Sequence, residues 1–143
     1  GLRIHYLDEG PKGAPPVLLL HGEPTWSYLY RKMIPPLVAA GHRCIAPDNL
    51  GFGLSDKPVT PLRPIEHAEI LKRLIQDRDL KNITLVVHDF GGPIGLAYAL
   101  EHPENVKRLI LFNTWMWSVK GDPHFGEHVE TIVAGGAVGS QRY

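Results

Sequence analysis

NITLVVHDFGGPIGLAYALEH (residues 82–102) combines two element patterns joined by a turn. It begins with an uncharged, largely β-branched run at residues 83–87, which is typical of a strand buried on both faces of a parallel sheet. Gly91, Gly92 and Pro93 then favour a tight turn followed by the first turn of a helix. Apolar residues after Pro93 continue that helical pattern. The stretch therefore predicts a strand, a sharp turn and a helix.

This order is the context of a nucleophile elbow, in which the turn lifts one reactive side chain above the carboxyl edge of a sheet. Serine commonly stands at the apex, between two small residues. Here Val87 takes the first of those positions and Asp89 is the apex. A carboxylate is already ionised at neutral pH, so Asp89 could attack carbon without a general base. Another group would then have to activate water to hydrolyse the resulting ester.

Asp89 also has a simpler interpretation, because aspartate is a preferred cap at the N-terminus of a helix. Taken alone, the residue would favour that interpretation. The apolar run before it and the Gly-Gly-Pro sequence after it favour the nucleophile instead.

The flanking sequence predicts further strands and helices in alternation. Residues 2–9 alternate as expected for a strand near a sheet edge. Residues 26–40 have helical spacing with Thr25 as N-cap, although Pro35 and Pro36 must kink or split that helix. The remaining expected elements are strands at 16–20, 42–47 and 106–113, a helix at 64–79 and a weak helix at 127–133.

Strands alternating with helices of this length indicate an α/β fold with a mostly parallel sheet and helices on both faces. The glycine-rich segment 48–58 follows a predicted strand, at the edge where open α/β sheets place their sites. It is not a phosphate-binding loop, because no GKS or GKT sequence or helix start follows it.

The composition limits the possible partners. The chain has 143 residues, with 15 Lys and Arg against 15 Asp and Glu, so its formal net charge is zero. Nucleic acid and anionic membrane are therefore not expected as main partners. Cys44, the single cysteine, lies in an apolar run and is expected to be a buried structural thiol. We expect a soluble, cytoplasmic protein without a signal peptide or membrane span.

The matching stretches 21–35, 46–58, 83–96 and 106–113 make the chain resemble the α/β-hydrolase superfamily, and within it the haloalkane dehalogenases. By this resemblance, Asp89 is the nucleophile that displaces halide from carbon. The backbone N–H groups of Glu23 and Phe90 would form the oxyanion hole, with His21, Gly22, His88 and Gly91 near the site. No cofactor or metal is implied, and the expected substrate is a small apolar halogenated compound or an epoxide.

Two positions depart from the family pattern. A tryptophan that binds the departing halide usually follows the nucleophile, but this chain has Phe90, which has no donor. Glu23 stands where a second halide donor, asparagine, is often found, and an ionised glutamate cannot donate. Trp115 or Trp117 could supply a replacement indole, or could pack in the helical cap that family members carry.

The rest of the family's triad is not matched by these residues. Asn113 lies where some branches carry the catalytic acid, and asparagine cannot act as that anion. His21 is expected to orient the oxyanion loop, and His88 to point away from Asp89, while His124 and His128 fall in the expected cap. We therefore expect residues 1–114 to be the N-terminal part of a core and 115–143 the start of a cap. The chain would be a fragment, inactive in turnover.

Two other functions are compatible with these residues. An epoxide hydrolase also uses an aspartate nucleophile, and the lack of a donor at Phe90 favours it. A non-catalytic binding domain of the same fold would account for the incomplete triad. Finally, the apolar strand 106–113 is expected at a sheet edge. That edge should either reduce solubility or be covered by residues 115–143.

Overall fold

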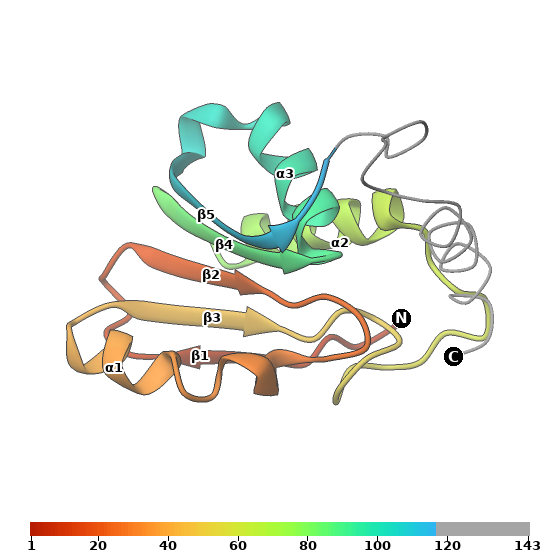
Figure 1. The fold of residues 1–143 in the computed structure, drawn as a ribbon, viewed down its shortest axis with the longest axis horizontal. Coiled ribbons are helices and arrows are strands. Elements are labelled where there is room, and N and C mark those ends of the chain that lie inside the picture. The colour runs from red at the N-terminus through yellow and green to blue at the C-terminus, as the bar shows by residue number, and fades with distance from the viewer. Residues whose placement is uncertain (117–143) are drawn as a thin grey trace.

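A computed structural model describes residues 1–116 and shows a five-stranded sheet with helices on both faces (Figure 1). The α/β prediction is confirmed. The strands are β1 (Tyr6–Glu9), β2 (Pro16–Leu20), β3 (Arg43–Pro47), β4 (Ile83–Asp89) and β5 (Val106–Thr114). The α-helices are α1 (Ile34–Ala39), α2 (Pro64–Asp77) and α3 (Gly91–Glu101), and short 3₁₀ helices are η1 (Ser27–Tyr30) and η2 (Pro103–Asn105).

The sheet has the strand order β1-β3-β2-β4-β5. All pairs are parallel except β1 with β3, which is antiparallel. The carboxyl ends of the four parallel strands therefore meet at one edge, where the loops after β2, β3 and β4 can approach one another.

Each face of the sheet carries its own apolar layer. Leu85 and Val87 of β4 belong to a cluster with residues of α2 and α3, whereas Val86 belongs to a cluster with residues of η1 and α1. In Figure 1, α3 lies beside β4 and β5, while α1 lies beside β3. Cys44 is fully buried in the second cluster, as expected from its apolar surroundings.

The helix expected over residues 26–40 is not continuous: it is split, as its two prolines led us to expect, but the break lies before them. That segment forms the 3₁₀ helix η1, a turn and then α1, which begins at Ile34 with Pro35 and Pro36 in its first turn. Proline has no N–H to donate, so the helix begins at the prolines instead of running through them. Thr25 is not an N-cap either, because its side chain donates to the carbonyl of Gly22.

The predicted strand at 2–9 is shorter than expected and lies at the sheet edge. Its first residues bond to the segment after β3: the N–H of Arg3 donates to Asp56, and that of His5 to Ser55. Only residues 6–9 pair with β3. The two helices after β3 and β4 fall close to their predicted positions.

β5 is the other outer strand of the described sheet, as predicted. Four consecutive apolar side chains on it are between 40% and 54% exposed, namely Leu109, Ile110, Leu111 and Phe112. The expected cap at 115–143 and the helix at 127–133 lie almost wholly outside the described residues, so covering of this edge stays a prediction. In residues 1–116 no helix has the length and hydropathy needed to cross a membrane.

Candidate active site

Asp89 is the last residue of β4 and has a backbone φ of +50°, in the left-handed region. α3 begins two residues later, at Gly91. Few residues other than glycine adopt this conformation, and it costs of order 1–3 kcal/mol. The predicted sharp turn between strand and helix is therefore present, with Asp89 at its apex.

The side chain of Asp89 does not cap α3. Phe90 occupies the N-cap position, and in the described part of the chain no side chain accepts a bond from the first turn. Instead, Oδ1 of Asp89 accepts a hydrogen bond of 2.9 Å from the backbone N–H of Glu23, in the loop after β2. Thr114 at the end of β5 donates to the Asp89 carbonyl at 2.6 Å. The elbow is thus tied to both neighbouring strands.

Two glycines allow the close approach of these segments. A Cβ on Gly22 would lie against the Asp89 carboxylate, 2.7 Å from its Cγ. A Cβ on Gly91 would meet the backbone carbonyl of Leu20, at 2.8 Å from its carbon. Any side chain at either position would displace the carboxylate or the start of α3.

Glu23 brings a second carboxyl group close to Asp89. Its pKa is raised, first by burial and then by the negative charge of Asp89. The Glu23 residue is half-buried, and its peptide bond to Pro24 is cis. Glu23 therefore presents a backbone donor to Asp89, while its side chain makes the surroundings less favourable to a further negative charge.

His21 is fully buried and connects the loops after β2 and β3. Its Nε2 accepts from the N–H of Asn49 at 2.9 Å, so Nδ1 carries the proton and donates to the carbonyl of Gly22 at 2.8 Å. Burial lowers the pKa of the imidazole, although the Gly22 carbonyl and the Asp48 charge oppose the shift. A neutral His21 thus joins the loop that carries Glu23 to the residue after Asp48.

His88 precedes Asp89 on β4 and pairs with Phe112. Side chains alternate along a strand, so it shares a face with Val86 and is directed away from Asp89. Among the described residues, its buried Nδ1 has no hydrogen-bond partner.

The ring of Phe90 packs edge-to-face against Trp115, with 5.3 Å between ring centroids. An indole therefore lies beside the residue that replaces the family's usual tryptophan. Asn113 forms the irregularity between β4 and β5, with φ +37°, and is exposed. Trp117, His124 and His128 lie outside the described residues.

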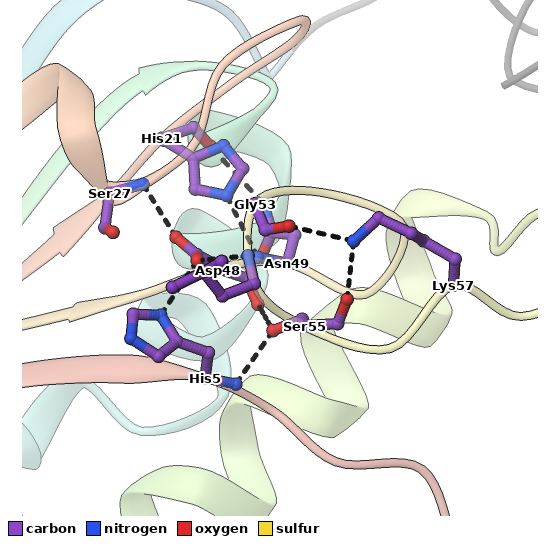
Figure 2. A network of polar contacts seen from close by, with 9 residues as sticks. His5, His21, Ser27, Asp48, Asn49, Gly53, Ser55 and Lys57 are labelled. Atoms are coloured by element: carbon purple, nitrogen blue, oxygen red, sulfur yellow. Dashed lines mark hydrogen bonds and ion pairs between the residues drawn. The ribbon is translucent and has the colours of Figure 1, made fainter.

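The carboxylate of Asp48, which the sequence did not single out as a functional group, follows β3 and is fully buried. It accepts hydrogen bonds from the N–H of Ser27 at 2.8 Å, the N–H of Leu54 at 2.9 Å and the ring of His5 at 2.9 Å (Figure 2). Burial by itself would raise the Asp48 pKa, but these bonds hold it below the usual value. An aspartate directly after an apolar strand, followed by a glycine-rich segment, was the available signal.

The described residues contain no group of three or more His, Cys, Asp or Glu side chains placed to bind a metal ion. Asp89 lies beside the backbone N–H of Glu23, which donates to its carboxylate, and near the carboxyl group of Glu23. This arrangement can hold an anionic nucleophile and stabilise an oxyanion beside it.

Residues 15–134 match the family described as alpha/beta hydrolase fold. A haloalkane dehalogenase of Psychrobacter cryohalolentis is 53% identical over 128 residues, which cover 88% of this chain and 42% of the relative. The tetrameric haloalkane dehalogenase DpaA of Paraglaciecola agarilytica superimposes with a TM-score of 0.85 at 45% identity, covering 96% of this chain and 46% of that one. An esterase of Exiguobacterium antarcticum gives a TM-score of 0.74 at 36% identity, covering 80% and 42%.

The chain thus spans less than half the length of the relatives that it matches. The esterase shares the fold, so the fold alone does not choose the reaction. The matched range contains β2 to β5, the helices between them and the Asp89 turn. The chain belongs to the α/β-hydrolase fold family, and its resemblance to the haloalkane dehalogenases is confirmed.

Proposed function

We propose that the complete protein containing this chain is a hydrolase that cleaves carbon–halogen bonds through a covalent ester on Asp89. The observation that carries this proposal is an aspartate, rather than a serine, at the elbow, with Oδ1 fixed by the Glu23 N–H. The haloalkane dehalogenase relatives support the same reaction class.

In the first step, a carboxylate oxygen of Asp89 attacks the carbon that bears the halogen. A carbon–oxygen bond forms while the carbon–halogen bond breaks, and the halide leaves with the bonding electron pair. The product is an alkyl ester of Asp89. No proton moves, so the step needs no base.

In the second step, water adds to the ester carbonyl carbon of Asp89. The negative charge of the tetrahedral intermediate develops on the former carboxylate oxygen, where the N–H groups of Glu23 and Phe90 stabilise it. Collapse releases the alcohol, which takes up a proton, and restores the carboxylate with one oxygen from water. His21 is not the base for this step, because both of its ring nitrogens hold backbone groups.

We expect the water-activating histidine and its acid partner to come from the part of the complete protein that this chain does not span. Residues 1–143 alone should therefore form the ester without completing turnover. Trp115 is our candidate for the halide donor, because its ring packs against Phe90, which has no N–H of its own.

Epoxide hydrolysis is the second candidate, favoured by that same lack of a donor on Phe90. It too would form an ester on Asp89, but by opening a strained ring, with the oxygen staying on the substrate. The choice between them depends on which substrate alkylates the protein.

A trapping experiment tests the proposal on the complete protein. It is incubated with 1,2-dibromoethane or styrene oxide in H₂¹⁸O, and the peptide containing Asp89 is analysed by mass spectrometry. We expect bromide release, an alkyl adduct or ¹⁸O on Asp89, and neither in Asp89→Asn. Asp8→Asn, which replaces a carboxylate distant from Asp89, is the matched control. A reaction with the epoxide only would support the second candidate, and neither an adduct nor ¹⁸O on Asp89 with either compound would favour a non-catalytic domain.

A further inference from the structure

We propose that Asp48 is a positioning residue that fixes the Glu23 N–H against Asp89. This inference rests on the proposed function, because it assigns Asp48 a part in hydrolysis of the Asp89 ester. Asp48 lies outside the reacting groups and acts through the loop after β2.

The first observation is where the hydrogen bonds to Asp48 come from. One carboxylate oxygen accepts from the N–H of Ser27, at the start of η1. The other accepts from the N–H of Leu54, in the glycine-rich segment, and from the ring of His5, before β1. Figure 2 shows these bonds meeting at Asp48. A single buried side chain thus joins three segments that are far apart in the sequence.

The second observation concerns the loop between β2 and η1. At one end, the N–H of Asn49 donates to His21 at 2.9 Å, and at the other end Ser27 donates to Asp48 at 2.8 Å. Two consecutive residues after β3 therefore hold both ends of residues 21–27. Glu23 lies between them, and its N–H has little freedom to move away from Asp89.

Internal bonds make this loop stiff enough to transmit the restraint. The carbonyl of Gly22 accepts from the ring of His21 at 2.8 Å and from the Thr25 hydroxyl at 3.0 Å. The Thr25 N–H points to the same carbonyl at 3.1 Å. These bonds hold the carbonyl of the Gly22–Glu23 peptide, the same peptide group that carries the Glu23 N–H, so a shift at Ser27 or His21 is carried to that donor.

Burying a carboxylate costs free energy unless hydrogen bonds satisfy its oxygens. The hydrogen bonds to Asp48 satisfy them, and the structure leaves room for this carboxylate only because residue 53 is glycine. A Cβ on Gly53 would lie 2.4 Å from the Cγ of Asp48. This separation is too short for two carbon atoms that are not bonded, so any side chain at residue 53 would displace the Asp48 carboxylate. An apolar residue at 48 could fill the space, but it could not orient the Ser27 N–H.

Displacement of the Glu23 N–H should affect the two chemical steps differently. Attack on the substrate needs the Asp89 carboxylate itself, and the elbow and Thr114 still hold that residue. Ester hydrolysis also needs the oxyanion donors in place. Removing one such donor typically costs 10²–10³ in rate, so misplacing it should cost about tenfold or more.

The test is pre-steady-state kinetics of the complete protein with 1,2-dibromoethane. In Asp48→Asn, one backbone N–H must face the new amide NH₂ group. We expect bromide release in the first turnover to change less than about threefold, while ester hydrolysis slows about tenfold or more and the Asp89 ester accumulates. Asp8→Asn, which also loses a carboxylate ion pair, should leave both rates unchanged. Equal effects on the two steps, or none, would overturn the inference.

Two further measurements keep the outcome clear. Amide hydrogen exchange at Glu23 should be faster in Asp48→Asn than in Asp8→Asn, at matched global stability. Equal exchange in the two variants would count against the positioning role even in an inactive protein.

If Asp48→Asn does not fold, His5→Leu removes one of the hydrogen-bond donors to Asp48 and should slow ester hydrolysis selectively, by about threefold. An unchanged ratio of the two rates would overturn the inference. Wild-type protein that forms no Asp89 ester would instead refute the proposed function.

Discussion

The backbone N–H of Glu23 donates to Oδ1 of Asp89 at 2.9 Å, across 66 residues of sequence. This bond joins the loop after β2 to the turn after β4, which are neighbours because β2 and β4 pair in parallel. It places a donor on the oxygen that would become the oxyanion during ester hydrolysis.

Gly22→Ala should remove most of the activity. The added Cβ would lie against the Asp89 carboxylate, so the carboxylate must turn away from the Glu23 N–H. We expect halide release to fall about 10²-fold, because small displacements of a reacting group have effects of that size. The measurement is bromide release from 1,2-dibromoethane by the complete protein. Gly13→Ala is the control, since its Cβ would have no atom within 4 Å. Similar activity in both variants would contradict the prediction.

Trp115→Phe should weaken halide binding. Phenylalanine keeps the packing against Phe90 but has no N–H, and a hydrogen bond to a charged group contributes about 1.5–3 kcal/mol. We expect bromide to inhibit turnover about tenfold less strongly in the variant. Trp26→Phe is the matched exchange, because that indole stacks on Tyr28 instead. Unchanged inhibition in Trp115→Phe would mean that Trp115 only packs.

The strand and turn around Asp89 were predictable because their signals are local. An uncharged β-branched run followed by Gly91, Gly92 and Pro93 restricts the chain within a few residues of the apex. At residues 26–40 the expected kink or split is present, but its place was not predicted: the break comes before Pro35 and Pro36, which lie in the first turn of α1. The helical spacing of apolar residues indicates which side chains are buried, but it does not show that one unbroken helix carries them.

The role of Asp48 could not be predicted in the same way. Its partners lie 6 to 43 residues away, and two of them are backbone N–H groups. Backbone donors belong to every residue except proline, so they leave no trace in the residue types. The sequence placed a polar residue at the end of β3, but only the fold shows which segments it holds.

Asp8→Asn should reduce stability at neutral pH and have no effect in strong acid. Two Arg43 nitrogens donate to the Asp8 carboxylate at 2.8 and 2.9 Å, and this pairing lowers its pKa to about 2. The carboxylate therefore stabilises the folded state above about pH 4, and this contribution is lost as pH falls toward 2. Because solvent partly screens the pair, we expect a difference of about 1–2 kcal/mol at pH 7.

Urea unfolding of wild type and Asp8→Asn between pH 2 and pH 7 measures this difference. Asp77→Asn, at the exposed end of α2, is the control and should change the free energy of unfolding by less than about 0.5 kcal/mol. A constant gap between wild type and Asp8→Asn down to pH 2 would show that the Arg43 pair is not its source.

His21 should make the fold less stable as the pH falls below 6.5. The folded imidazole is neutral, with Nε2 accepting from Asn49, and burial lowers its pKa below the model-compound value of 6.5. Below that pH the unfolded chain binds a proton that the folded chain resists, so the free energy of unfolding decreases, by at most about 1.4 kcal/mol per pH unit for one group. The loss continues until the folded pKa is reached.

The measurement is the slope of the free energy of unfolding between pH 6.5 and pH 5, in wild type and in His21→Gln. The variant cannot take up that proton, so its slope should be smaller. Burial, and after it the charge of His21, also lowers the pKa of His67, so both proteins are compared in a His67→Gln background to remove that contribution. Protonation of His21 in the folded protein would turn a second N–H toward the donor of Asn49, so the loop that carries Glu23 should loosen only as the pH approaches the folded pKa, where the stability stops falling. Amide exchange at Glu23 that stays constant through the pH at which the stability stops falling would show that protonation of His21 does not move this donor.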